Sequence, residues 1–542
     1  METRFTNSLL KLGFILTGLT IMNAQSPALQ WQKALGGSSY DQAYSIQQTT
    51  EGGYIVAGST SSKDGDVTGY HSDPNSSFVD DFWIVKLNES GTLQWQKALG
   101  GSNSEVANAV KQTNDGGYII AGFTSSNDAD VSGNHSSNND FWIVKISSSG
   151  NIEWQKTLGG TGNDRAQSIQ QTSDGGYIVA GSTESLNGDV TGYHGTFGED
   201  YWVVKLSALG IIEWQKALGG KNHDRAYSVR QTADGGYIVA GESNSLDGDV
   251  GVGNHGSGNS PTMDYWIVKL NSTGNIEWKK IFGGKEADSA TEIQQTTDGG
   301  YIVAGISSSN DGDVSGNHLS SGGFPTSDYW VVKLTNSGNI EWQKSLGGSG
   351  QESGTGFLVS IQQTYDGGFI VAGESGSNNG DVSGNHGGKD YWVVRLNMTG
   401  SILWQKTLGG TFGDIAQCVR QTADGGYIIA GYTGSSNGDV SGYHSGFDFW
   451  IVKLNPDAMS VNDIKTTENL SIYPNPVKDM ITINGNLAKN TKAFIYDING
   501  QIVKQINEIN NQMIEVENLA TGSYILEIIQ NHKKQSIKFI KK

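Results

Sequence analysis

An aspartate-rich loop that ends in histidine recurs seven times in this 542-residue chain and holds most of the side chains that could do chemistry. Its pattern is D/N-G-D-V-x-G-x-H, with small departures. The histidines are His71, His135, His194, His255, His318, His386 and His444, and the accompanying aspartates are Asp66, Asp130, Asp189, Asp249, Asp313, Asp381 and Asp439. An imidazole beside carboxylates could transfer protons, and carboxylate oxygens could bind a cation.

Three of these loops have the spacing of the first half of a calcium-binding loop, in which alternate oxygen ligands precede a glycine. The candidate calcium ligands are Asp64, Asp66, Asp128, Asp130, Asp311 and Asp313. No glutamate stands at the twelfth loop position, and asparagine replaces the first aspartate in three other units. The alternative is a loop whose carboxylates bond backbone N–H groups and whose histidine packs against the following Asp-aromatic-Trp. Calcium is the one cofactor that the sequence indicates.

The repetition argues against an enzyme, because catalysis needs an asymmetric constellation of a base next to a nucleophile or an acid. Every unit offers the same side chains, and departures from the repeat are few. They are His223 beside Asp224, Cys418 in place of a strand serine, and an insertion over 350–359. A buried small side chain is the simpler interpretation of Cys418. We therefore predict no catalytic site.

The loops belong to repeats of about 60 residues, the first feature to seek in a long chain. Each unit reads W-Q-K-x-L-G-G, A-x-S-I-x-Q-T, D-G-G-Y-I-V-A-G and D-Y-W-V-V-K-L, which predicts four short strands. The first and last of these motifs together hold all 14 tryptophans. The last two motifs are nearly continuous apolar runs, and this predicts strands buried on both faces.

Seven such units predict an all-β fold, a seven-bladed β-propeller with four-stranded blades over 25–455. The repeats begin at Trp31 with a fourth strand and end at Trp450 with a third strand. Pairing these two segments would let the N-terminal strand close the ring and hide two free edges. A solenoid is the runner-up fold. The units resemble the SBBP-type β-propeller repeat, a bacterial family with LGG, DGG and VxKL signatures, and this resemblance implies a fold and no particular ligand.

A polar linker over 456–469 leads to a C-terminal segment, 470–542, whose short apolar runs predict a small β-sandwich. Its motifs include Tyr473, Pro474, Asn475 and Pro476, the turn that ends at Gly500, and the pair Gly522 and Tyr524. The segment resembles the type A C-terminal sorting domain of the type IX secretion system of Bacteroidota. The resemblance implies contact with the type IX secretion machinery, export across the outer membrane, removal of the domain, and release or attachment at the cell surface.

The N-terminus predicts the same route. Residues 1–24 have the pattern of a secretory signal peptide, with Arg4 and Lys11 as positive charges, a short apolar run over 13–22, and Ala24 at a cleavage point. The run is too short to cross a bilayer. The net charge of −19 disfavours nucleic acid as a partner. We therefore predict a secreted or outer-surface protein that passes through the periplasm and has no transmembrane segment.

Propeller connectivity places the loops after the second and fourth strands of every unit on one side of the ring, called the loop face below. This face collects the repeated Asp and His residues, including Asp41, Asp164, Asp224 and Asp414. Polar and aromatic residues on one face suit a glycan or a protein ligand. The sequence therefore predicts a monomeric binding or adhesion protein. The alternative is a secreted polysaccharide-active hydrolase or lyase that uses the same face.

Overall fold

The computed structural model describes residues 25–71, 79–195, 198–256, 261–352, 358–457, 470–485, 487, 491–497, 502–507, 509, 511–530 and 533–542. Two compact units divide the chain, Met1–Ala458 and Met459–Lys542. Every regular element of the described residues is a β-strand. The expected signal peptide, 1–24, and most of the expected linker, 456–469, lie outside the described residues. Within the described ranges no helix is long and apolar enough to cross a membrane.

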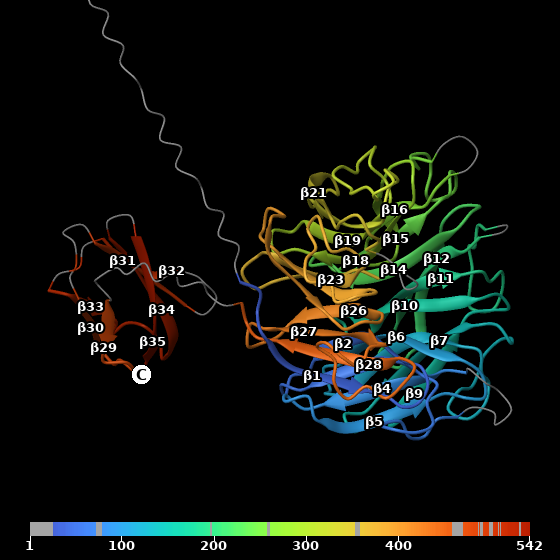
Figure 1. The fold of residues 1–542 in the computed structure, drawn as a ribbon, viewed down its shortest axis with the longest axis horizontal. Coiled ribbons are helices and arrows are strands. Elements are labelled where there is room, and N and C mark those ends of the chain that lie inside the picture. Colours follow the sequence, from blue (N-terminus) through green and yellow to red (C-terminus); the bar gives the residue numbers. More distant parts are fainter. Residues whose placement is uncertain are drawn as a thin grey trace, which may run out of the picture. The chain divides into compact units, whose positions relative to one another are not determined.

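Seven four-stranded antiparallel sheets, here called blades, follow one another through the first unit (Figure 1). Blade 1 is β2 (Asp41–Gln48), β3 (Tyr54–Thr60), β4 (Asp81–Leu87) and β5 (Leu93–Leu99); blade 2 is β6 (Glu105–Gln112), β7 (Tyr118–Thr124), β8 (Asp140–Ile146) and β9 (Ile152–Leu158); blade 3 is β10 (Asp164–Gln171), β11 (Tyr177–Thr183), β12 (Asp200–Leu206) and β13 (Ile212–Leu218). Blade 4 is β14 (Asp224–Gln231), β15 (Tyr237–Ser243), β16 (Asp264–Leu270) and β17 (Ile276–Phe282); blade 5 is β18 (Asp288–Gln295), β19 (Tyr301–Ser307), β20 (Asp328–Leu334) and β21 (Ile340–Leu346); blade 6 is β22 (Ser360–Gln363), β23 (Phe369–Ser375), β24 (Asp390–Leu396) and β25 (Ile402–Leu408).

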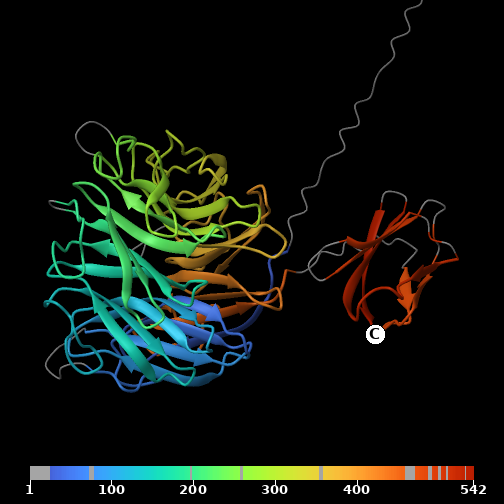
Figure 2. The same cartoon turned by 180° about the vertical axis from the view of Figure 1, so that it is seen from behind.

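Blade 7 is built from both ends of the unit. Its strands are β26 (Asp414–Gln421), β27 (Tyr427–Thr433), β28 (Asp448–Leu454) and the N-terminal β1 (Leu29–Leu35). β1 runs antiparallel to β28, with Trp31 opposite Lys453 and Leu35 opposite Phe449. Figures 1 and 2 show the blue N-terminal strand beside the orange strands of this blade from both sides. The predicted ring closure by the N-terminal strand is confirmed, and so is the seven-bladed propeller.

Burial follows the predicted order within each blade. All seven residues of β3 and of β4 are buried, whereas β5 is half-buried or exposed from Leu93 to Lys97. Neighbouring blades cover both faces of each sheet, and for this reason the two central strands have apolar side chains on both sides. The fourth strand lies at the outer edge, where one side meets water.

Tryptophans join each blade to the next. Trp142 in β8 packs on Phe82 in β4 of the preceding blade, with ring centroids 4.5 Å apart, and the outer Trp95 lies 6.0 Å from Tyr118 of the following blade. The same two kinds of contact occur at every blade junction. All 14 tryptophans therefore lie at blade junctions, and this explains why the two tryptophan motifs recur with the repeat.

The second unit is a small β domain with two sheets. One sheet holds β29 (Ser471–Tyr473), β30 (Met480–Asn484) and β33 (Met513–Glu515); the other holds β32 (Ile502–Ile506), β31 (Lys492–Tyr496), β34 (Gly522–Gln530) and β35 (Lys533–Lys541). Side chains of both sheets, such as Ile481 and Leu526, share one core. This arrangement fits the predicted sandwich.

Candidate functional site

The loop histidines bind the aspartates that begin the third strand of their own blade. His71 Nδ1 lies 2.9 Å from Asp81 Oδ2, and the backbone N–H of His71 donates to the same oxygen at 2.9 Å. Both contacts recur in the other six blades. Each of these aspartates is fully buried. The imidazole therefore satisfies a buried carboxylate in every unit, whose charge would otherwise be costly to bury.

The other imidazole nitrogen faces the next blade. His71 Nε2 lies 3.6 Å from Asp130 Oδ2, and His135 Nε2 lies 3.7 Å from Asp189 Oδ2. Equivalent approaches of 3.8 to 4.0 Å follow at three further junctions. At the ring closure, burial lowers the pKa of His444, but Asp448 and Asp66 outweigh it and raise the pKa above its usual value. The recurring Asp and His side chains therefore link neighbouring blades.

The candidate calcium ligands bond backbone amides of the Leu-Gly-Gly loop that precedes the same blade. Asp64 Oδ1 accepts from Ser38 N at 2.7 Å, and Asp66 Oδ2 accepts from Gly36 N at 3.2 Å. Asp128, Asp130, Asp311 and Asp313 make the matching contacts in blades 2 and 5. No group of three or more His, Cys, Asp or Glu side chains that could hold a metal ion occurs in the ranges that the structure describes. Calcium binding stays a prediction.

Pairs of buried carboxyl groups lie where the Leu-Gly-Gly motif crosses from one blade to the next. A Cβ atom added to Gly219 would lie 2.6 Å from Asp224 Oδ2 and 2.7 Å from Asp200 Oδ1, so only glycine fits between the two carboxyls. Asp224 Oδ2 accepts from Gly220 N and from Ser245 Oγ, at 2.8 and 2.9 Å. The Oδ1 atoms of Asp200 and Asp224 have no hydrogen-bond partner among the described residues. Two buried carboxyls thus lie close together at this junction.

Burial raises the pKa of these carboxyls because a low-dielectric site disfavours the charged form. It raises the pKa of Asp224 to about 7 and that of Asp41 to about 6. The pKa of Glu105, which replaces aspartate in blade 2, rises to about 7 for the same reason. The junctions therefore hold protons at a pH where ordinary carboxylic acids have lost them.

The central channel holds side chains that the sequence reasoning missed. A cavity of about 80 Å³ lies among the first strands of the blades, and Lys111, Arg230, Glu292 and Arg420 line it. Nothing in the local motif marks them as functional. The available signal was their departure from the repeat, in which glutamine or serine stands at these positions.

Two other departures from the repeat, Cys418 and His223, are at least partly buried. Cys418 is buried and its Sγ lies 3.7 Å from the carbonyl oxygen of Ile46. His223 is half-buried, and its backbone N–H donates to Asn244 Oδ1 at 2.8 Å. Most of the insertion, 353–357, lies outside the described residues. The described surroundings of Cys418 fit a packed side chain.

Two motifs of the sorting segment contact its last strand, β35. Asn475 accepts from Ile540 N at 2.9 Å and donates to the carbonyl oxygen of Lys538 at 3.0 Å, which joins the Tyr-Pro-Asn-Pro segment to the last strand. Tyr524 stacks on Phe539 with centroids 5.5 Å apart, and its hydroxyl donates to the carbonyl oxygen of Ala520. Tyr473 is 57% exposed. Gly500 lies outside the described residues.

Residues 471–542 match the family described as secretion system C-terminal sorting domain. This confirms the recognition of a type IX cargo protein. It indicates export of the protein, and a secreted or outer-surface location. The domain also implies that the type IX secretion machinery handles the chain.

Other likenesses are distant. Over 228 residues, 40% of this chain, the sequence is 25% identical to the regulatory protein FlaEY of Caulobacter vibrioides (strain ATCC 19089 / CIP 103742 / CB 15), and the match spans 23% of that protein. The crystal structure of BBS1N in complex with ARL6DN covers 80% of this chain and 98% of its own, with 9% identity and a TM-score of 0.40. A PL25 ulvan lyase bound to -[GlcA(1-4)Rha3S]- covers 80% and 99%, with 11% identity and a TM-score of 0.41.

The buried carboxyls predict that stability falls as the pH rises from about 5 to about 7.5. A folded pKa of about 7 for Asp224 exceeds the ordinary unfolded value, so the folded state binds more protons in this window and loses stability as they leave. Each unit of pKa difference corresponds to roughly 1.4 kcal/mol. Asp224→Asn should flatten the dependence of the melting temperature on pH. The groups that face this carboxyl are Asp200 with its partner His194, and Tyr201.

A matched control is Asp234→Asn, which lies in a turn on the face of the ring opposite the loop face. Hydrogen bonds from Thr232 and Lys269 outweigh burial there and lower the pKa of Asp234 to about 2. This substitution should leave the slope between about pH 5 and 7.5 unchanged, since the group is ionised throughout. Equal slopes for Asp224→Asn and the wild type would contradict the assignment.

Calcium binding has a thermal test. If the Asp-Gly-Asp loops bind the ion, EDTA should lower the melting temperature and calcium should restore it. A ligand held by the native state alone stabilises by about 2.7 kcal/mol at a hundredfold excess over Kd. Asp313→Ala and Asp66→Ala should remove most of this response. Asp249→Ala is the control, because an inserted residue breaks the ligand spacing in that loop; a melting curve insensitive to EDTA would favour the backbone-bonding alternative.

Proposed function

We propose that this exported chain is a binding or adhesion protein whose propeller recognises a glycan or a protein through its loop face. The observation that carries the proposal is a set of exposed aromatic side chains in loops of that face. Phe324 is 74% exposed, Phe412 is 63% exposed, and Tyr40 is 44% exposed. Aromatic rings supply large contact areas with little loss of conformational entropy, and they are frequent at binding surfaces.

These aromatic side chains lie on the part of the propeller that runs from blade 5 through blades 6 and 7 to blade 1, called the aromatic sector below. Phe324 lies in the loop between β19 and β20 of blade 5, Phe412 lies in the loop that leads into blade 7, and Tyr40 lies in the loop from blade 7 to blade 1. Tyr40 also packs on Phe447, with centroids 5.5 Å apart. The sector therefore breaks the sevenfold symmetry, as a site for one ligand must do.

Binding is favoured over catalysis because most acid–base side chains of the loop face already contact one another. Each loop histidine contacts a buried aspartate through Nδ1, and in five blades its Nε2 also approaches an aspartate of the next blade. A general acid or base must instead reach the substrate. The exposed aromatic rings thus recognise the ligand, whereas the repeated Asp and His residues hold the blades together.

A glycan and protein array probed with the purified chain tests the binding proposal. Phe412→Ala and Phe324→Ala should weaken the signal for a bound ligand at least tenfold, which corresponds to about 1.4 kcal/mol for each lost ring. Tyr365→Ala is the matched control, because Tyr365 is 75% exposed in a turn at the other end of the strands. Full binding by the Phe412→Ala and Phe324→Ala variants would contradict the site, and release of soluble sugar from a polysaccharide panel would favour the hydrolase or lyase alternative.

Deleting residues 470–542 tests the role of the sorting domain. The propeller has its own core clusters, separate from the core of the second unit, so the truncated chain should keep its melting temperature. It should stay in the periplasm of a host with a working type IX system, because the sorting motifs are gone. Appearance of the truncated chain in the medium or on the cell surface would contradict the role of the sorting domain in export.

A further inference from the structure

The first strands of the blades carry a repeated glutamine that links neighbouring blades around the channel. Gln47 Oε1 accepts from the backbone N–H of Gln112 in the next blade at 2.9 Å. Gln170, Gln294 and Gln362 make the same bond to the blades that follow them. Each of these glutamines therefore satisfies a backbone donor at the channel wall, which would be costly to leave without a partner.

Three blades lack this glutamine and have a cation in its place. The replacements are Lys111 in β6, Arg230 in β14 and Arg420 in β26. The side-chain amide link to the following blade is therefore absent at these three junctions. Substitution of a structural residue by a charge that cannot make the same bond is typical of a position kept for function.

Two of the three cations converge on one carboxylate. Arg230 Nη2 lies 2.9 Å from Glu292 Oε1, and Arg420 Nη2 lies 2.8 Å from the same oxygen. Glu292 replaces the serine that stands at this position in most blades. Burial would raise the pKa of Glu292, but Arg420 and Arg230 outweigh it and lower the pKa to about 2. One negative charge is therefore shared by two guanidinium groups.

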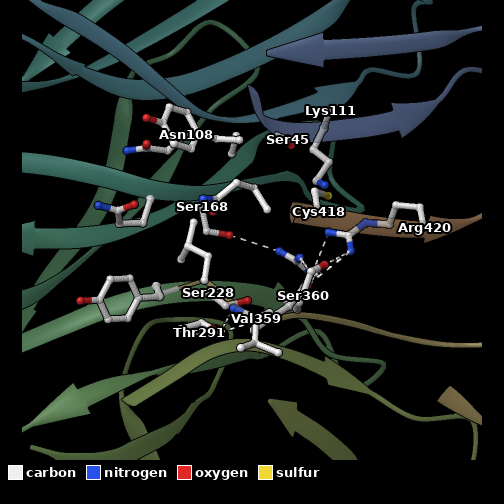
Figure 3. A pocket seen from close by; sticks show the side chains of 18 residues that line it. Ser45, Asn108, Lys111, Ser168, Ser228, Thr291, Val359, Ser360, Cys418 and Arg420 are labelled. Atoms are coloured by element: carbon white, nitrogen blue, oxygen red, sulfur yellow. Dashed lines mark hydrogen bonds and ion pairs between the residues drawn. The ribbon is translucent and has the colours of Figure 1, made fainter. Parts of the chain in front are cut away.

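Lys111 has no such partner. Its ammonium group makes no hydrogen bond or ion pair with any described residue. Figure 3 shows Lys111 reaching into the space beside Cys418, on the side where Arg420 also projects. Burial, together with Arg420 and Arg230, outweighs the attraction of Cys418 and Glu292 and lowers the pKa of Lys111 to about 7. With all groups ionised, three cations face one carboxylate in a chain whose net charge is −19.

The space beside these groups suits a small ligand with hydrogen-bond acceptors. The cavity has a volume of about 80 Å³, and the hydroxyl groups of Ser45, Ser168 and Ser360 also line it. Ser168 Oγ accepts from Arg230 at 3.2 Å, and Ser360 Oγ accepts from Arg420 at 3.0 Å. A planar guanidinium group presents several N–H donors in a geometry that fits carboxylate or sulfate oxygens.

We propose that the central channel of the propeller is a binding site for a small oxyanion of carboxylate or sulfate size, held by Lys111, Arg230 and Arg420. The anion supplies the negatively charged partner that Lys111 lacks, and it shares the guanidinium donors with Glu292. The acidic surface keeps most anions away, whereas the three cations concentrate positive potential at this one point of the channel. The site is separate from the aromatic sector of the loop face, and it does not depend on that sector binding a ligand.

The repeat itself supplies the variants for a test. Lys111→Gln and Arg420→Gln restore the residue that four other blades carry, so these variants should fold and regain the link between blades. Lys97→Gln in the outer strand β5 is the matched control for loss of one lysine. Isothermal titration calorimetry of the full chain with sodium sulfate and sodium acetate, at constant ionic strength in chloride, measures the affinity.

The wild type and Lys97→Gln should bind sulfate or acetate with equal affinity, while Lys111→Gln should lose at least tenfold and the double variant should not bind. A sulfated or uronate-containing oligosaccharide in place of the free salt distinguishes the two sources of the anionic group. Binding of the oligosaccharide alone, lost in Lys111→Gln, would assign the channel to a charged group of a larger ligand. Equal affinity of the wild type and Lys111→Gln for every probe, or no binding of any probe by the wild type, would overturn the proposal.

Discussion

Aromatic contact between neighbouring blades is the interaction on which the rest of this structure depends. A single blade exposes apolar side chains on both faces of its sheet, and only a blade on either side can cover them. Trp83 shows the requirement at the ring closure, because its partner Phe449 belongs to the last blade, with ring centroids 4.4 Å apart. The N-terminal strand completes that last blade. Folding of the whole ring is therefore tied to the pairing of its two ends.

At the loop face, the polar residues of the repeat also hold neighbouring blades together. Buried aspartates and the histidines that bind them link neighbouring blades around the ring. Glycines occupy the narrow spaces between the carboxyl groups. Gly219 illustrates the constraint, since a side chain there would collide with Asp200 and Asp224. Residues that resemble catalytic groups in the sequence thus hold the blades together. Function is more readily sought where a blade departs from the repeat.

Two departures stand out, and they lie in different parts of the propeller. The channel has Lys111, Arg230 and Arg420 where other blades have glutamine, and the loop face has exposed rings such as Phe412 on one sector. Both break the sevenfold symmetry in a way that packing does not require. A repeated scaffold can carry such local changes because, apart from the contact of Arg420 with Glu292 across the channel, the described contacts of a blade are mainly with its neighbours, and the rest of the ring keeps its own contacts.

The sequence by itself determined the number of blades, the two buried central strands, the ring closure and the sorting domain, because periodic apolar runs and turn glycines are local signals. The contact of His71 with Asp81 is one of the two alternatives that the sequence offers, whereas its approach to Asp130 of the next blade is not predicted, since loop residues do not reveal which neighbours they meet. Only the tertiary structure brought Lys111, Arg230, Glu292 and Arg420 together. They come from four blades far apart in the chain, and closure of the ring is the step that turns all four side chains toward one channel.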